Sequence, residues 1–144
     1  MKRKLIAILG VAAVGLGTLS LLTRGQSPAD RSALPTKGDP LVAVTLPAAL
    51  SAGAEAGRRA FDATCATCHG DAAGGRTGFG PPLVHPIYEP SHHADTAFLR
   101  AVQQGAPAHH WHFGDMPPQP GVTPAEVADI LAYVRELQRA NGID

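Results

Sequence analysis

The segment CATCHG, Cys65–Gly70, contains the only two cysteines of the chain and places a histidine directly after the second one. Four uses of this motif are possible: a disulfide, a redox dithiol, half of a zinc site, or a covalent attachment point. A disulfide within C-x-x-C would close a very short loop and connect no separate parts of the chain. A thioredoxin-type dithiol needs a preceding strand in a βαβ unit, and structural zinc needs a second ligand pair at matching spacing. The sequence offers neither of these.

Covalent haem attachment satisfies every constraint of the motif. Two thiols on one helical turn reach the two vinyl groups of a haem, and the next residue presents an imidazole to the iron. The sequence therefore predicts one haem c, attached through Cys65 and Cys68 and coordinated by His69. Because both cysteines are used, the chain has no spare thiol.

Length and charge limit the remaining possibilities. The 144 residues can form one core of roughly 100 residues once the ends are removed. From Asp30 onward there are eight basic and twelve acidic residues, a net charge of about −4. This balance argues against nucleic acid as a partner.

The N-terminus has the pattern of an export element. Lys2, Arg3 and Lys4 precede an 18-residue apolar run, Leu5–Leu22, which as a helix would span about 27 Å. The run is longer than a usual signal core, so we favour a retained signal anchor over residues 1–22 in the inner membrane. A cleaved signal peptide is the alternative, with small residues at 27–29 as the cleavage site, and the protein would then be soluble in the periplasm. In both cases the remaining chain lies on the periplasmic side.

Residues 23–50 are predicted to form a flexible linker, because prolines and glycines recur along them. One stretch within the linker, LVAVTL at Leu41–Leu46, is apolar enough to form a short strand or to lie over the core. The folded domain is predicted over residues 51–144.

The domain is predicted to be all-α, with long loops at residues 70–91 and 105–122. A first helix runs from Ser51 into Cys65, and a second begins at Asp95 as cap and ends at Gly105. The third and clearest helix has Thr123 as cap and Pro124 at its first position. Their expected inward residues are Gly57, Ala60, Phe61 and Thr64; then Phe98, Ala101 and Val102; then Val127, Ile130, Leu131, Val134 and Leu137.

Residues 51–140 resemble the class I c-type cytochromes. The resemblance rests on Gly57 and Phe61, CATCHG, GPPL at residues 80–83, GDMPP at residues 114–118 and the helix ILAYVREL, in that order. It implies three main helices wrapped around one covalent haem, with Gly57 and Phe61 against Ile130 and Tyr133. It also implies that the carbonyl of Pro81 accepts a hydrogen bond from His69, which fixes the ligand ring.

The resemblance further implies a function. Two protein ligands on the iron would leave no open position for a substrate, so we expect single-electron transfer rather than an enzyme. The expected partners are membrane or periplasmic redox proteins.

Met116 is predicted as the sixth ligand, in competition with imidazoles of the same loop. Pro117 and Pro118 stiffen the chain after it, and a neutral thioether suits ferrous iron. The competing ligands are His109, His110 and His112.

Six histidines follow His69, many of them clustered in SHHAD (residues 91–95) and HHWHF (residues 109–113). Most simply, His92, His93, His109, His110 and His112 are solvated loop residues, with Trp111 packed against a haem edge. The alternative is a haem-containing metal-handling or sensor module in which the histidines bind copper or zinc.

Overall fold

The computed structural model describes residues 35–144. The predicted anchor at residues 1–22 and residues 23–34 of the predicted linker lie outside the described residues. Within residues 35–144, no helix is both long and apolar enough to cross a membrane.

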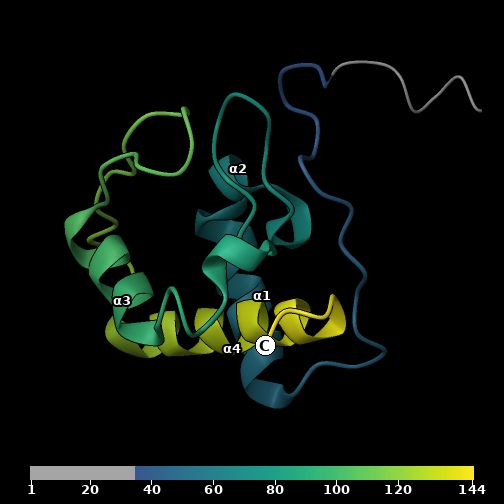
Figure 1. Ribbon diagram of the computed structural model, residues 1–144. Coiled ribbons are helices and arrows are strands. Elements are labelled where there is room, and N and C mark those ends of the chain that lie inside the picture. The colour runs from purple at the N-terminus through teal and green to yellow at the C-terminus, as the bar shows by residue number, and fades with distance from the viewer. Residues whose placement is uncertain (1–34) are drawn as a thin grey trace, which may run out of the picture. The chain divides into compact units, whose positions relative to one another are not determined.

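Helices carry the fold of the described residues, and their arrangement is shown in Figure 1. They are α1 (Ala52–Thr64), α2 (Ala66–His69), α3 (Asp95–Gln104) and α4 (Pro124–Ala140), with the short 3₁₀ turns η2 (Asp71–Ala73) and η3 (Pro86–Tyr88). Residues 35–144 contain no strand, only two isolated bridges. The all-α prediction and its two long loops are therefore confirmed for this part of the chain.

Local capping chemistry sets where α4 and α1 begin. The Thr123 hydroxyl accepts a hydrogen bond from the Glu126 backbone N–H at 3.2 Å, and the Glu126 carboxylate accepts one from the Thr123 N–H at 2.8 Å. These two bonds form a capping box, and Thr123 as cap and Pro124 as the first helical residue are as predicted. Ser51 caps α1 by accepting from the Ala54 N–H at 3.2 Å.

The start of α3 differs from the prediction by one residue. Ala94 is the N-cap, and Asp95 is the first residue of the helix. The Asp95 carboxylate instead accepts a hydrogen bond from Arg135 of α4, at 3.0 Å. The Asp95 side chain, which the sequence predicts as the helix cap, therefore forms a tertiary ion pair with Arg135 instead.

Helices α1 and α4 cross at the residues that the resemblance implies (Figure 1). A Cβ on Gly57 would lie 1.8 Å from the Asp129 carbonyl oxygen, so only glycine allows the two backbones to approach this closely. Phe61 is fully buried and meets Tyr133 edge-on, with ring centroids 5.6 Å apart. The core around this crossing consists of Ala54, Phe61, Ala73, Val84, Ile130, Tyr133, Val134, Leu137 and Ile143.

Residues 35–50 run along the domain without regular secondary structure (Figure 1). The backbone N–H groups of Leu41 and Val42 both donate to the Gly74 carbonyl, at 3.2 and 3.0 Å. Thr45 exchanges two hydrogen bonds with the Asn141 side chain, each 2.9 Å long. The apolar stretch is therefore a segment laid over the core and not a strand. The flexible-linker prediction needs correction for residues 35–50, because their backbone groups are bonded to distant parts of the domain.

Candidate haem-binding site

A cavity of about 770 Å³ opens between α1 and α2 on one side and α3 with the following loop on the other. Cofactor pockets commonly measure roughly 300–1,000 Å³ and are lined mainly by apolar groups. The apolar lining residues include Phe61, Phe79, Leu83, Tyr88, Ala97, Phe98, Ala101, Val102, Trp111, Phe113 and Ile130. The predicted site residues Cys65, Cys68, His69, Pro81 and Met116 all line the same cavity.

The two cysteines reach the cavity because α1 leads directly into the short helix α2. The Cys65 N–H continues the helical pattern by donating to the Phe61 carbonyl at 2.7 Å. Both thiols are free, so the pair does not form a disulfide. Burial, with a smaller effect from Cys68, raises the pKa of the Cys65 thiol to about 11. Two thiols on one helical turn are thus presented to one apolar space.

The ring of His69 is held in a single orientation. Its Nδ1 lies 2.9 Å from the Pro81 carbonyl oxygen. A carbonyl can only accept, so Nδ1 carries the proton and Nε2 keeps the lone pair that a metal needs. Burial lowers the pKa of His69, and the hydrogen bond to Pro81 raises it to a smaller extent, so the ring is neutral at neutral pH. The predicted hydrogen bond is present, and it sets up this imidazole as a ligand.

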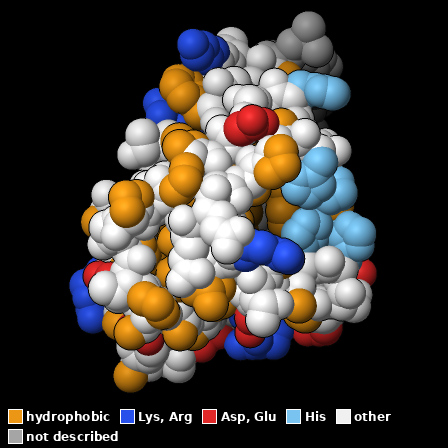
Figure 2. All heavy atoms as spheres, turned by 90° about the vertical axis from the view of Figure 1, so that its left-hand side faces the viewer, with side chains coloured by type: hydrophobic (Ala, Val, Ile, Leu, Met, Phe, Trp, Pro, Cys, Tyr) orange, Lys and Arg blue, Asp and Glu red, His pale blue; other side chains and the backbone are white. Residues whose placement is uncertain are grey.

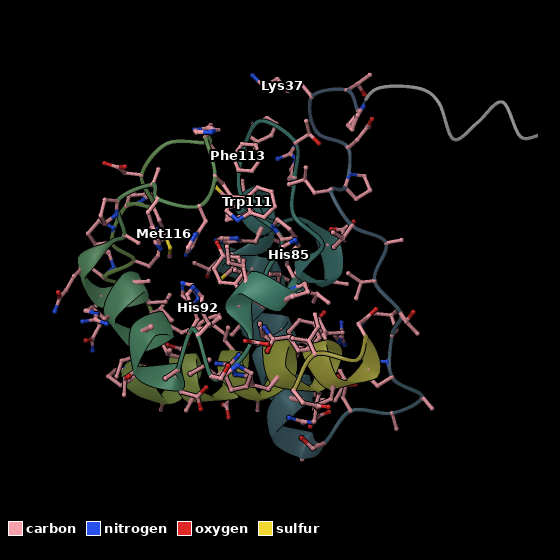
Figure 3. The ribbon with its side chains drawn as sticks, in the orientation of Figure 1. Lys37, His85, His92, Trp111, Phe113 and Met116 are labelled. Carbon is pink, nitrogen blue, oxygen red and sulfur yellow. The ribbon has the colours of Figure 1, made fainter. Side chains whose placement is uncertain are left out.

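Met116 lines the cavity from the loop that follows α3 (Figure 3). Its backbone forms an antiparallel bridge with Ala106, with hydrogen bonds of 2.9 and 3.0 Å. The Gln119 N–H donates to the Val102 carbonyl at 2.7 Å, which ties the loop to the end of α3. The chain is therefore held on both sides of Pro117 and Pro118, by the Met116–Ala106 bridge before them and by the Gln119 hydrogen bond after them.

Two of the competing imidazoles share the cavity. His109 and His110 line it together with Met116, whereas His112 is exposed and does not. His112 thus lies outside the cavity lining, and the choice of Met116 over the imidazoles of this loop stays a prediction.

A family model for cytochrome c matches residues 54–138. The chain belongs to the cytochrome c family. No curated protein and no solved structure matches the chain. Cytochromes c bind haem c and are generally electron carriers rather than enzymes. Family membership therefore supports a haem-based electron-transfer role for this chain.

The cavity of this cytochrome c fits a haem in two further respects. First, α3 has no buried residue, and its apolar side chains Phe98, Ala101 and Val102 face the cavity, where an apolar macrocycle would cover them. Second, the buried indole N–H of Trp111 has no well-aligned partner among the described residues. It lies close enough to the Tyr88 hydroxyl to lower the pKa of that group, although burial raises this pKa by more. A haem propionate is an acceptor of the kind that a buried indole needs.

Sequence reasoning missed two residues that shape this cytochrome c, Arg135 and Gln138 of α4. Arg135 donates to the carbonyls of Tyr88 and His93, at 2.8 and 2.6 Å, and to the Gln138 side-chain oxygen at 2.7 Å. Gln138 donates in turn to the carbonyls of Leu83 and Tyr88, at 2.8 and 3.0 Å. Both side chains are buried and together hold the irregular loop that forms one wall of the cavity. Their helical spacing from Leu131 and Val134, which places them beside the apolar stripe, is the signal that indicates burial.

Proposed function

We propose that this cytochrome c is a class I, monohaem electron carrier. The supporting observation is that one cavity collects a thiol pair, an oriented imidazole and a thioether, namely Cys65 and Cys68, His69, and Met116. One haem c bound there would supply one-electron exchange between ferric and ferrous iron.

The cysteines would hold the cofactor covalently. Addition of a thiol S–H across a vinyl group would give a thioether without a leaving group, so each cysteine could form one bond to the cofactor. Cys65 and Cys68 are both free and both face the cavity. The adjacent His69 would then bind the iron through Nε2, because its Nδ1 proton is engaged by Pro81.

Met116 would supply the second protein ligand of the iron. The Ala106 bridge and the two prolines after Met116 restrict its backbone, as a fixed ligand requires. A thioether raises the reduction potential relative to a second imidazole. If His69 and Met116 both bind the iron, no coordination site would be left for a substrate, which would favour a carrier over an enzyme.

The proposed partners are redox proteins that dock briefly at the cavity rim, such as a quinol-oxidising complex, a dehydrogenase or a terminal oxidase. Transient electron-transfer contacts bury little surface, typically below about 1,200 Å². The net charge of about −4 from Asp30 onward disfavours a nucleic-acid partner.

We propose the periplasmic side of the inner membrane as the location, with residues 1–22 as anchor. The support is the apolar run after three positive residues. After expression with haem-maturation machinery, the protein should sediment with membranes at high salt, and periplasmic protease should release a haem-bearing fragment. A soluble mature form that begins near Asp30 would instead identify a cleaved signal peptide.

A redox titration followed by absorption tests the electron-transfer function. The purified holoprotein should titrate as a single one-electron couple, and its ferrous form should not bind carbon monoxide. Ready binding of carbon monoxide would show a labile sixth position and would assign the protein to the ligand-binding or catalytic haem proteins.

A further inference from the structure

Three histidines that line the cavity converge on one another, although the sequence places them in two separate loops. His92 and His93 precede α3, and His110 follows it. Their potential ligand nitrogens all lie within 4.8 Å of one another. Figure 2 shows a patch of histidine side chains on one face of the molecule, and His92 is labelled in Figure 3. The candidate site is accessible, because His92 is exposed and the other two rings are half-buried.

The loop that carries two of these rings is held firmly. The backbone N–H groups of His92 and His93 donate to the Glu89 carbonyl, at 3.1 and 2.8 Å. The His93 carbonyl accepts from Arg135 at 2.6 Å. The rings are therefore presented by a fixed turn and not by a free loop.

His93 is oriented as a metal ligand by a backbone carbonyl. Its Nδ1 lies 2.6 Å from the Ile87 carbonyl oxygen. By the reasoning used for His69, Nδ1 carries the proton and Nε2 is free to coordinate. This ring thus has the support that protein metal ligands usually have.

The charges around the cluster permit a cation. Burial is the main cause that lowers the pKa values of His93 and His110, and neighbouring histidines lower them further, whereas the hydrogen bond to Ile87 opposes the shift at His93. Arg135 is the one arginine whose charge acts on the pKa of His93, and its guanidinium is paired with Asp95 at 3.0 Å. Its charge therefore opposes a metal ion only weakly.

We propose that His92, His93 and His110 bind one divalent ion of the zinc and copper class, with water completing the coordination shell. Imidazole is a preferred ligand of these ions. Zinc–nitrogen bonds of about 2.0–2.1 Å in a tetrahedral site place the nitrogens about 3.4 Å apart, so an ion would draw the three rings together by about 1 Å. This site goes beyond electron transfer, and it requires that His110 is not the sixth haem ligand, in agreement with the proposed role of Met116.

Zinc titration of the holoprotein by isothermal calorimetry tests the site, since Zn²⁺ has no redox chemistry of its own. Wild-type protein should bind one Zn²⁺, and His92→Ala, His93→Ala and His110→Ala should each lower the affinity by about tenfold or more. His112→Ala is the matched control, because His112 lies in the same loop but outside the cluster, and it should leave the affinity unchanged. Haem spectra and helical circular dichroism of each variant check whether the fold is retained. His92→Ala replaces an exposed residue, so this variant should fold as the wild type does.

Several results would overturn the proposal. Weak binding without a defined stoichiometry, or an equal loss in His112→Ala, would show adventitious surface binding only. A changed axial-ligand spectrum in His93→Ala or His110→Ala would show that the ring belongs to the iron. Loss of covalent haem in the wild type would instead contradict the proposed function and would be detected separately from the zinc isotherm.

Discussion

Replacing Gly57 with alanine should destabilise the domain strongly. The added Cβ would lie 1.8 Å from the Asp129 carbonyl oxygen, 2.3 Å from its carbonyl carbon and 2.8 Å from the Ile130 nitrogen. All three are backbone atoms of α4, so no side chain can move aside. The two helices must separate by more than about 1 Å before the contact becomes tolerable, and this separation loosens the Phe61–Tyr133 contact at the centre of the core.

The size of the effect follows from two opposing terms. Overpacking costs about 1–3 kcal/mol and occasionally more, and a clash with backbone belongs at the upper end. Alanine regains about 1 kcal/mol in helix propensity over glycine. We expect a net loss of about 2–3 kcal/mol, which lowers the Tm by about 8–15 °C for a domain of this size.

Gly53 provides the control on the same helix. A Cβ there would lie 3.8 Å from a flexible Asp129 side-chain oxygen, which is an ordinary contact. Gly53→Ala should therefore stabilise by about 0.5–1 kcal/mol through propensity alone. Guanidinium unfolding of both holoproteins, followed by helical circular dichroism, measures the difference. If Gly57→Ala stays within about 0.5 kcal/mol of wild type, or if both variants shift alike, the close crossing of α1 and α4 is refuted.

Three further predictions concern single side chains. Met116→Ala should abolish the weak far-red iron–thioether band of the oxidised protein and lower the reduction potential; an unaffected spectrum that changes only when His110 is replaced would indicate bis-histidine ligation. Arg135→Leu should cost about 3–5 kcal/mol in chemical unfolding, because it leaves buried acceptors unpaired, whereas Arg139→Leu on the exposed face of the same helix should cost less than about 0.5 kcal/mol; similar losses would contradict the buried network. The Glu126 pKa lies below its ordinary value of 4.5 because of backbone and side-chain hydrogen bonds from Thr123, so its contribution to stability is complete above that value and is lost as pH falls through the folded-state pKa. Glu126→Gln should thus flatten the decline of Tm between about pH 5 and pH 3, and an unchanged slope would show that this carboxylate is not responsible.

Sequence predicts best where the chemistry is local. The start of α4 depends on Thr123, Pro124 and Glu126, which lie within four residues, so their pattern specifies the cap directly. The same holds for Cys65, Cys68 and the following histidine, which one helical turn brings to one cavity. Family resemblance adds the Pro81 carbonyl, which lies twelve residues from the ring that it orients.

Prediction fails where distant residues compete for a side chain. The sequence predicts Asp95 as a helix cap, but its carboxylate accepts a hydrogen bond from Arg135, forty residues away. From the sequence alone, Arg135 and Gln138 would be placed on the exposed face of the helix. They are buried because they donate hydrogen bonds to backbone carbonyls of the irregular loop at residues 83–93.

The histidine cluster is a second example of this limit. Adjacent histidines such as His92 and His93 do not usually converge on one ion. Here a turn closed on the Glu89 carbonyl presents both rings, and the loop after α3 brings His110 to them. Neither arrangement leaves a pattern in the sequence.

Mass spectrometry of the denatured holoprotein tests the central claim, covalent attachment of one haem c, most directly. Both thiols should be bonded to the cofactor, so the mass after acid–acetone treatment should be that of the mature chain plus one haem. The Cys65→Ala/Cys68→Ala double variant should give the chain alone. A wild-type chain that releases free haem on denaturation, and shows no added mass, would contradict the account.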